Sequence, residues 1–350
     1  MYLTSLSFLN FRSYDRKRFQ FSKGMTVFLG PNAVGKTNIL EGIFLVSTGK
    51  SFRAEEDRDL IKWGNELARV KAQVEDKEEP LDLEVVLTAG VVAGQKAPHK
   101  KYLVNGIGRR MVDFVGKFKT ILFWPEDLKL VTDSPSIRRK YLNFVLVQLD
   151  REYRRSLLSY EKGLRQRNRV LEKIRKGEAA RRELLFWDQL LIRTGNYLTA
   201  KREELIREVN ETNKPFGVFS ITYEASIISE ARLSHYADAE VATGVTLVGP
   251  HRDDFLFFEN KRDITKFGSR GEQRLSVVWL KLAELEYVKK VSDETPVLLL
   301  DDIFSELDHE HREWVMEIMR SQQTILTTTD RHFLPPGLIQ EAEVVELSES

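Results

Sequence analysis

The segment from residue 30 to residue 37 has the composition of a loop that binds phosphate. It reads Gly30, Pro31, Asn32, Ala33, Val34, Gly35, Lys36, Thr37 and fits the pattern G-x-x-x-x-G-K-[ST]. An apolar stretch, MTVFL, precedes it and a helical pattern, KTNILEGIFLVS, follows it, as that loop requires. Glycines let backbone N–H groups curl around a phosphate, and the helix N-terminus adds partial positive charge. We therefore expect ATP binding, with Lys36 on the β- and γ-phosphates and the Thr37 hydroxyl on Mg²⁺.

Two adjacent carboxylates, Asp301 and Asp302, follow the apolar run PVLLL. A run that is apolar at every position is typical of a strand buried on both faces of a parallel sheet, and such sheets bind ligands at the carboxyl ends of their strands. We expect Asp301 to hold Mg²⁺ and Asp302 to orient or deprotonate the attacking water. The alternative is a strand end whose two acids face solvent.

A second glycine turn leads into a helical pattern, LSVVWLKLAELE. Its residues are Ser269, Arg270, Gly271, Glu272 and Gln273. A helix N-terminus can bind an anion, but one triphosphate needs only one such cradle. The alternative is an ordinary helix cap, because serine is a preferred capping residue.

Basic residues are concentrated between residues 151 and 182. This stretch has twelve Lys or Arg and four Glu, a local balance of +8 in a chain whose net charge is +1. Such an asymmetry favours binding to nucleic-acid phosphates, and the alternative is a solvated helix face. The candidate DNA contacts are Arg165, Arg167, Arg169, Lys173, Arg175 and Lys176, with Arg138, Arg139 and Lys140 before them. We expect the nearby aromatics Phe186, Trp187 and Tyr197 to pack at helical spacing rather than to stack on bases.

Two smaller groups of residues have competing interpretations. Arg12, after the first apolar run, either reaches a nucleotide phosphate or is a surface arginine at a strand end. The string GPHRDD, residues 249–254, contains one histidine beside two acids, which is a poor set of metal ligands. We expect hydrogen bonding at a strand end there.

The composition excludes several classes of protein. The 350 residues are 42% hydrophobic and 31% charged, with 54 basic and 53 acidic side chains, which excludes a disordered or globally basic chain. The absence of cysteine excludes disulfides, cysteine-ligated zinc and thiol catalysis. No run of 18 uncharged apolar residues occurs, so we expect a cytoplasmic protein that does not bind membranes.

The elements that position these residues form an α/β pattern with a helical insertion. Short strand patterns occur at residues 3–9, 25–30, 81–87, 120–123, 218–223 and 297–300. Between residues 137 and 215, apolar residues recur at steps of three and four, which predicts a helical hairpin turning near Lys176 and Gly177. Each leg would have roughly 35 residues and reach about 50 Å. We therefore divide the chain into a discontinuous α/β head, residues 1–136 and 216–350, and an α-helical arm, residues 137–215.

Several strings together resemble the RecF family, which is similar to the heads of SMC proteins and to ABC-type ATPases. They are LSFLNFRSYDRKRF, GPNAVGKTNILEGIFLVSTGKSFR, FWPEDLKLVTDSPSIRRKYLN, GPHRDD, LLLDDIFSELD and a late TTTD, and they run over nearly the whole chain. The resemblance implies an ABC-type ATPase head with mixed sheets and a short arm. It also implies that Ser269 to Gln273 are a signature loop capping ATP held by a second copy, that Asp308 belongs to the D-loop, and that Arg12 contacts ATP.

The resemblance further implies a function in recombinational gap repair. Such proteins dimerise with ATP on double-stranded DNA near single-strand gaps, act with RecR and RecO to help load RecA, and hydrolyse ATP slowly for release. Three features depart from the wider ABC pattern: Asp302 stands in place of a glutamate, and neither a switch histidine nor a Q-loop glutamine has a clear counterpart. We therefore expect a weak, DNA-stimulated ATPase that acts as a switch. The alternatives are an SMC-like protein scaffold closed by ATP and an ABC transporter ATPase subunit.

Overall fold

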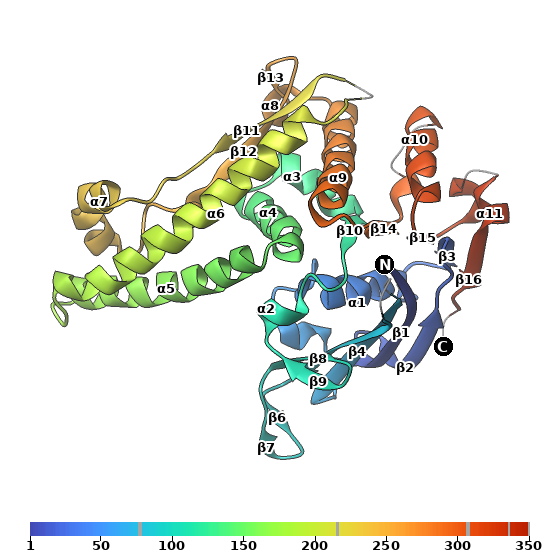
Figure 1. Ribbon diagram of the computed structural model, residues 1–350, viewed down its shortest axis with the longest axis horizontal. Helices are drawn as coiled ribbons and strands as arrows, with labels where there is room; N and C mark the ends of the chain where they lie inside the picture. Colours follow the sequence, from blue (N-terminus) through green and yellow to red (C-terminus); the bar gives the residue numbers. More distant parts are fainter. Residues whose placement is uncertain (76–78, 215–216, 306–308, 335–336, 349–350) are drawn as a thin grey trace. The chain divides into compact units, whose positions relative to one another are not determined.

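The computed structural model describes residues 1–75, 79–214, 217–305, 309–334 and 337–348 (Figure 1). Its contacts divide the chain into two compact units. The first unit consists of Met1–Asp127 and Val288–Ser350, and the second of Leu128–Tyr287. Residues 217–287 therefore pack in the second unit, whereas the division made from sequence assigns them to the head. The functional division into head and arm stays a prediction.

A parallel sheet forms the centre of the first unit. Its strand order is β10 (Thr120–Phe123), β14 (Val297–Asp301), β15 (Thr324–Thr328), β3 (Met25–Leu29) and β16 (Ala342–Glu346). Every neighbouring pair is parallel, and all residues of β10, β14 and β15 are buried. The uninterrupted apolar run at residues 297–300 is explained by this burial on both faces, as predicted.

An antiparallel sheet forms the second layer of the first unit. Its order is β2 (Tyr14–Gln20), β1 (Tyr2–Phe11), β4 (Leu67–Glu75), β5 (Leu81–Thr88), β8 (Lys100–Val104) and β9 (Ile107–Arg109). The helix α1 (Lys36–Thr48) contacts β4 and β5 of this sheet and β10, β14 and β15 of the parallel sheet. Because α1 is covered from both sides, all but two of its residues are buried. This burial explains why apolar residues occur around most of its circumference.

The second unit consists of helices and one small sheet. The helices are α3 (Lys129–Thr132), α4 (Pro135–Leu149), α5 (Arg151–Arg175), α6 (Leu185–Glu211), α7 (Glu230–Thr243), α8 (Ile264–Phe267) and most of α9 (Arg270–Ser292), which continues past Tyr287 into the first unit. The antiparallel sheet has the order β11 (Phe219–Glu224), β12 (Asp254–Glu259) and β13 (Arg262–Asp263). The remaining elements of the chain are β6 (Val91–Val92), β7 (Gln95–Lys96), α2 (Met111–Phe114), α10 (His309–Arg320), α11 (Leu338–Glu341) and short 3₁₀ turns.

The predicted helical hairpin is formed by α5 and α6, which lie side by side (Figure 1). Its turn follows Lys176, where Gly177 has φ 78°, a left-handed conformation that glycine adopts without strain. The prediction of a single helix in the first leg is wrong. Asp150 has extended backbone angles and its carboxylate accepts hydrogen bonds from the N–H groups of Glu152 and Tyr153, so it ends α4 and caps α5. The helix α5 consequently spans about 37 Å instead of 50 Å.

No helix in the described residues combines the length and the apolar character needed to cross a bilayer.

Candidate functional site

The phosphate-loop segment joins β3 to α1, and its two glycines are required by close contacts. Gly35 has φ 106°, and a Cβ there would lie 2.8 Å from the Tyr14 hydroxyl oxygen. A Cβ on Gly30 would lie 2.6 Å from the carbonyl oxygen of Leu347. The loop is therefore held closely between β2 and the segment after β16, and neither glycine can be replaced without moving its neighbours.

Lys36 is buried, and its ammonium group points back to the loop. The Nζ atom donates hydrogen bonds to the carbonyl oxygens of Gly30, at 2.7 Å, and Pro31, at 2.8 Å. Burial lowers the pKa of Lys36, and the negative charges of Asp302 and Asp301 oppose that shift. These contacts place the ammonium group at the loop, where a phosphate would need a positive charge.

The predicted magnesium ligands meet although they are 264 positions apart in the sequence. The Thr37 hydroxyl donates to the Asp301 carboxylate, with Oγ1 lying 2.9 Å from Oδ2 and 3.1 Å from Oδ1. Thr327 also donates from its hydroxyl to Asp301 Oδ1, at 2.6 Å. The register of the parallel strands explains this, because Asp301 at the end of β14 lies opposite Thr327 in β15. Hydroxyl and carboxylate oxygens suit Mg²⁺, so the donor set fits the expected ion.

Asp302 begins the segment after β14 in an unusual backbone conformation. Its φ is 49°, and its N–H donates to the carbonyl oxygen of Thr327 at 3.1 Å. Aspartate and asparagine enter the left-handed region more readily than most residues, because their short side chains can hydrogen-bond locally. This conformation gives a physical reason for aspartate at a position where the ABC pattern has glutamate.

Arg12 is tied to the helix that follows the phosphate loop. Its Nε and Nη2 atoms donate to both carboxylate oxygens of Glu41, at 2.8 and 2.7 Å, and Nη1 donates to the carbonyl oxygen of Asp59 at 2.9 Å. Glu41 lies in α1, is completely buried, and also accepts from the Ser51 hydroxyl. In the structure Arg12 joins the β1–β2 turn to α1, and a contact to a nucleotide stays a prediction.

The signature segment lies in the second unit and begins α9. Ser269 and Glu272 form a reciprocal capping box: Ser269 N–H donates to Glu272 Oε2 at 2.7 Å, and Glu272 N–H donates to Ser269 Oγ at 3.3 Å. The pKa of Glu272 is lowered, mainly by the hydrogen bond from the Ser269 N–H and secondly by the hydrogen bond from Arg262. Gln273 is buried and donates to the carbonyl oxygen of Ile264 at 3.1 Å. Arg270 is exposed on the first turn.

Gly271, in the same turn, has no close neighbour that requires glycine. A Cβ there would come no closer than 3.9 Å to another atom, and the residue is exposed. No packing contact within the described residues therefore explains glycine at this position. The predicted D-loop residue, Asp308, lies outside the described residues.

The candidate DNA-binding residues separate into buried and exposed groups. Arg138 pairs with Asp254 through Nε at 2.6 Å and Nη2 at 2.9 Å, and Arg167 pairs with Asp188 and Glu240, each at 2.7 Å. Both arginines are buried, so their guanidinium groups hold the second unit together and do not present themselves to a ligand. Arg139 and Lys140 are half-buried. The exposed candidates are Arg165, Arg169, Lys173, Arg175 and Lys176.

The solvent face of α5 carries a row of basic residues that the sequence motifs revealed only in part. We call it the α5 stripe; it consists of Arg151, Arg155, Lys162, Arg165, Arg169, Lys173 and Lys176, all exposed. The spacing of three, four and seven residues places them on one side of the helix. Arg155 and Lys176 have acidic neighbours on α5, Glu152 at 3.6 Å and Glu172 at 2.9 Å. The same periodicity that predicts the helix could have selected Arg151, Arg155 and Lys162.

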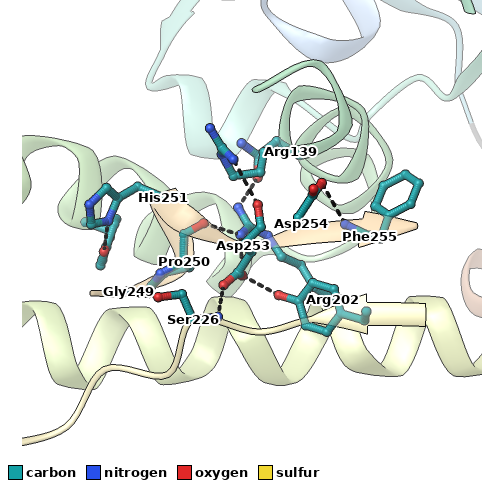
Figure 2. A network of polar contacts seen from close by, with 12 residues as sticks. Arg139, Arg202, Ser226, Gly249, Pro250, His251, Asp253, Asp254 and Phe255 are labelled. Atoms are coloured by element: carbon teal, nitrogen blue, oxygen red, sulfur yellow. Dashed lines mark hydrogen bonds and ion pairs between the residues drawn. The ribbon is translucent and has the colours of Figure 1, made fainter. Parts of the chain in front are cut away.

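The string GPHRDD belongs to a buried polar network in the second unit (Figure 2). Arg202 of α6 donates to Asp253 Oδ2 at 2.8 Å and to the carbonyl oxygen of Pro250 at 2.7 Å. Asp253 also accepts from the Tyr223 hydroxyl and from the N–H of Ser226. Asp253 is fully buried, so these contacts fasten the start of β12 to α6. The prediction of strand-end hydrogen bonding is confirmed.

His251 of the same string has a hydrogen-bond partner at each of its ring nitrogens. Its Nε2 lies 3.0 Å from the carbonyl oxygen of Thr246, which can only accept, so Nε2 carries the proton. Its Nδ1 therefore accepts from the Tyr160 hydroxyl at 2.7 Å. Burial lowers the pKa of His251 to about 4. Within the described residues, no group of three or more His, Asp or Glu side chains is arranged to hold a metal.

The aromatic residues near the end of the hairpin differ in their exposure. Tyr197 donates from its hydroxyl to Asp150 at 2.7 Å, and Trp187 is half-buried. The prediction that Phe186 packs at helical spacing is wrong, since 66% of its surface is exposed. The spacing of apolar residues cannot show whether a helix has a neighbour to pack against. Phe186 lies in the first turn of α6, beyond the end of α5 at Arg175.

Comparisons with known proteins cover nearly the whole chain. The family model described as "RecF/RecN/SMC N terminal domain" matches residues 2–337. The "DNA replication and repair protein RecF" of Lachnoclostridium phytofermentans is 36% identical, with 94% of this chain and 93% of that protein covered. The protein with that description in Moorella thermoacetica is 35% identical, covering 99% and 95%.

Solved structures agree with the sequence comparison. One described as "Structure of the recombination mediator protein RecF-ATP in RecFOR pathway" has a TM-score of 0.87 and 29% identity, covering 95% of this chain and 93% of that one. An SMC head bound to a domain of ScpA has a TM-score of 0.51 and 16% identity, which shows a shared fold. The match over residues 2–337 and the relatives at 35–36% identity settle the classification: the chain belongs to the RecF family of DNA replication and repair proteins.

Proposed function

We propose that this protein binds ATP and duplex DNA in recombinational gap repair, and that ATP joins two copies on DNA near single-strand gaps. The observation that carries the proposal is the contact between Thr37 and Asp301, at 2.9 Å, beside the buried Lys36. It brings together a phosphate-binding loop and a strand-end carboxylate, which is the arrangement that phosphoryl transfer from a nucleotide requires. The related structures of RecF with ATP support ATP as the ligand.

The chain's own groups have separate tasks in ATP binding. The N–H groups of residues 30–37 and the N-terminus of α1 would surround the phosphates, with Lys36 neutralising the β- and γ-phosphates. Thr37 Oγ1 and the Asp301 carboxylate would hold Mg²⁺, with Thr327 orienting that carboxylate. When bound, Mg²⁺ neutralises phosphate charge.

Hydrolysis would be carried out by Asp302. Its carboxylate follows Asp301 directly, and its left-handed backbone turns the chain away from β14. We assign it the orientation and deprotonation of the attacking water. Slow turnover is expected from the missing switch histidine and Q-loop glutamine, so that ATP acts mainly as a switch and hydrolysis releases DNA.

ATP-dependent dimerisation would use the start of α9. Ser269 and Gly271 of one copy would cap the phosphates bound to Lys36 and Thr37 of the other. The exposed Gly271 supports this, because glycine there costs helix stability and a Cβ in its place would lie 3.9 Å from its nearest neighbour in the described residues, the Ser269 hydroxyl oxygen. Asp308 would contribute as the D-loop residue.

DNA would be bound by the α5 stripe. Its exposed basic groups can neutralise phosphates without reading bases, and its length of about 37 Å is close to one turn of B-DNA. We further propose that this protein acts in the cytoplasm, where it would help RecR and RecO to load RecA. The related RecF structures are described as belonging to the RecFOR pathway, which supports this part of the proposal.

Light scattering tests the proposal with the full chain. The mass should double when ATP and Mg²⁺ are added, and the complex should bind duplex DNA at low salt and release it at high salt. Lys36→Arg serves as the control that impairs ATP binding or hydrolysis. Dimerisation without any DNA binding at low salt would instead favour the ATP-driven protein scaffold, and a monomer under all conditions would contradict the proposal.

A further inference from the structure

The end of the arm exposes two large apolar side chains. Leu185 and Phe186, in the first turn of α6, are 63% and 66% exposed, whereas Leu184 and Leu191 of the same hairpin are buried. The Phe186 ring contacts the edge of the Trp187 ring, with 4.9 Å between centroids. Trp187 therefore supports Phe186 from one side and leaves much of the ring open to solvent.

Two exposed arginines lie on the same helix face as these two side chains, and the exposed Glu183, beside Arg182, accepts from the N–H of Ala180. Arg182 lies one turn before Phe186, and Gln189 and Arg193 follow it at three and seven positions, all exposed. The one acid among residues 184–202, Asp188, is turned toward the buried Arg167, with the Nε–Oδ1 distance 2.7 Å. In the described part of the chain, neither Arg182 nor Arg193 forms an ion pair. We call this surface the tip face; it consists of Arg182, Leu185, Phe186, Gln189 and Arg193.

The composition of the tip face selects among possible ligands. Unpaired arginines favour an anionic ligand, but phosphates alone make no use of an exposed phenyl ring. Aromatic rings beside basic groups are the means by which proteins bind single-stranded nucleic acid, because every base has a face that stacks. Two apolar side chains are too few for a helix that lies in a membrane surface, which needs a continuous apolar face.

The position of the tip face agrees with such a ligand. The α5 stripe ends at Lys176, and only the short turn of residues 177–184 separates it from α6. A duplex that is held along α5 and ends or opens near Lys176 would present its unpaired bases to the end of the arm that carries Phe186. We propose that the tip face binds unpaired bases of single-stranded DNA, with Phe186 stacking on a base and Arg182 and Arg193 contacting the adjoining phosphates. This inference rests on the proposed function, since it assumes that the α5 stripe holds duplex DNA.

Two DNA substrates separate the tip face from the stripe. One is a blunt duplex, and the other is the same duplex with a single-stranded gap that carries 2-aminopurine as a fluorescent base. Binding of each is measured for the wild-type chain, Phe186→Ala and Phe186→Tyr. Trp63→Ala is the matched control, because Trp63 is a 98% exposed aromatic residue of the other unit.

Phe186→Ala should weaken binding of the gapped DNA about 5- to 150-fold, the range expected for the loss of one stacked base, and leave blunt-duplex binding unchanged. Stacking should quench 2-aminopurine in the wild type and in Phe186→Tyr but not in Phe186→Ala. Trp63→Ala should bind both DNAs like the wild type.

The two proposals fail in different ways. If Phe186→Ala binds gapped DNA as tightly as the wild type, or loses affinity equally for both DNAs, the inference is overturned while salt-dependent duplex binding still supports the proposed function. If Phe186→Ala binds gapped DNA as tightly as the wild type, the remaining candidate ligand of the tip face is an acidic protein. If the wild type binds neither DNA, the proposed function fails and the inference fails with it.

Discussion

At the residue scale, the candidate ATP site depends on short polar contacts at the carboxyl ends of two parallel strands. Asp301 is in position because β14 and β15 place it opposite Thr327, and the Thr37 hydroxyl meets it from α1. Asp302, the next residue, has a left-handed backbone and so points in a direction that a continuing strand would not allow. The two adjacent acids therefore point in different directions, and we propose a different role for each.

Replacing Asp302 by Asn should separate ATP binding from hydrolysis. Asparagine tolerates the left-handed backbone, so folding should be preserved, but its amide cannot accept a proton. We expect hydrolysis to fall by about 10²- to 10⁴-fold while ATP affinity changes little. Phosphate release and nucleotide binding should be measured in parallel, with Glu55→Gln as an exposed acid for comparison. Hydrolysis at the wild-type rate would remove Asp302 from the mechanism.

Arg12 should contribute strongly to stability through Glu41. The carboxylate of Glu41 is fully buried, and Arg12→Ala would leave it with only part of its hydrogen bonding. Loss of one partner of a buried pair costs about 3–5 kcal/mol, so the urea midpoint should fall sharply. The same Arg12→Ala substitution should cost much less when it is made in a chain that already carries Glu41→Ala, because no buried carboxylate then loses its partner.

Arg16→Ala is the matched control for Arg12, because Arg16 is an exposed arginine on the neighbouring strand β2. If Arg12→Ala is as stable as Arg16→Ala but binds ATP weakly, the ion pair with Glu41 does not contribute to stability. A contact between Arg12 and the nucleotide is then favoured.

At the element scale, helix surfaces decide which charged residues can act. The α5 stripe faces solvent, whereas Arg167 on the same helix faces α6 and α7 and is buried against Asp188 and Glu240. A basic residue one or two positions away from the stripe thus has a different task. The distinction comes from the helix period and from the elements that pack on each side.

Substitutions in the α5 stripe should reduce DNA affinity in proportion to the phosphates lost. The double variant Arg165→Ala, Arg169→Ala removes two exposed cations without breaking a packing contact. The slope of log affinity against log salt concentration should become shallower by about 1.8, since each phosphate contact contributes about 0.9. Binding of duplex DNA at several salt concentrations measures the slope. Arg207→Ala, at the far end of α6, should leave it unchanged; an unaltered slope in the double variant would contradict contact by the stripe.

The buried His251 should make the second unit sensitive to acid. Its folded-state pKa is lowered to about 4 by burial, from an ordinary value of 6.5, so the unfolded chain binds a proton at higher pH than the folded chain does. Stability is therefore fully present above pH 6.5 and should decline as the pH falls from 6.5 toward 4, by at most about 1.4 kcal/mol per pH unit. Urea unfolding at several pH values should show the decline, and His251→Gln should flatten it. The exposed His235→Gln should retain it.

At the scale of the whole molecule, the chain supplies two parts that phosphate binding would use separately. The loop of residues 30–37 lies in one compact unit and the start of α9 in the other. A second copy would provide the cap for each nucleotide. Gly271, whose lack of a side chain no packing contact in the described residues explains, would act in the contact between copies.

Two substitutions at the start of α9 should abolish dimerisation and still leave a folded monomer, although Ser269→Arg removes a helix cap that contributes about 1 kcal/mol. Gly271→Ala should leave the monomer unchanged or more stable by about 0.4–1 kcal/mol, because alanine is the better helix residue. Ser269→Arg should still bind ATP. Both should stay monomeric by light scattering with ATP and Mg²⁺, since each fills the space that a phosphate would occupy. A normal dimer in either variant would disprove capping between copies.

The local elements and the motifs could be predicted from the order of the amino acids alone. The period of the apolar residues predicts the strand at 297–300, helix α1 and the turn at Gly177, because local burial patterns and glycine conformations are properties of adjacent residues. The motifs predicted Lys36, Thr37 and Asp301. Only the tertiary structure decided the contacts between distant segments: Thr327 with Asp301, Glu41 with Arg12, and the burial of Arg138 and Arg167. The exposure of Phe186 likewise became visible only in the folded structure. Side-chain exposure depends on which elements pack on each face, and spacing within one element does not contain that information.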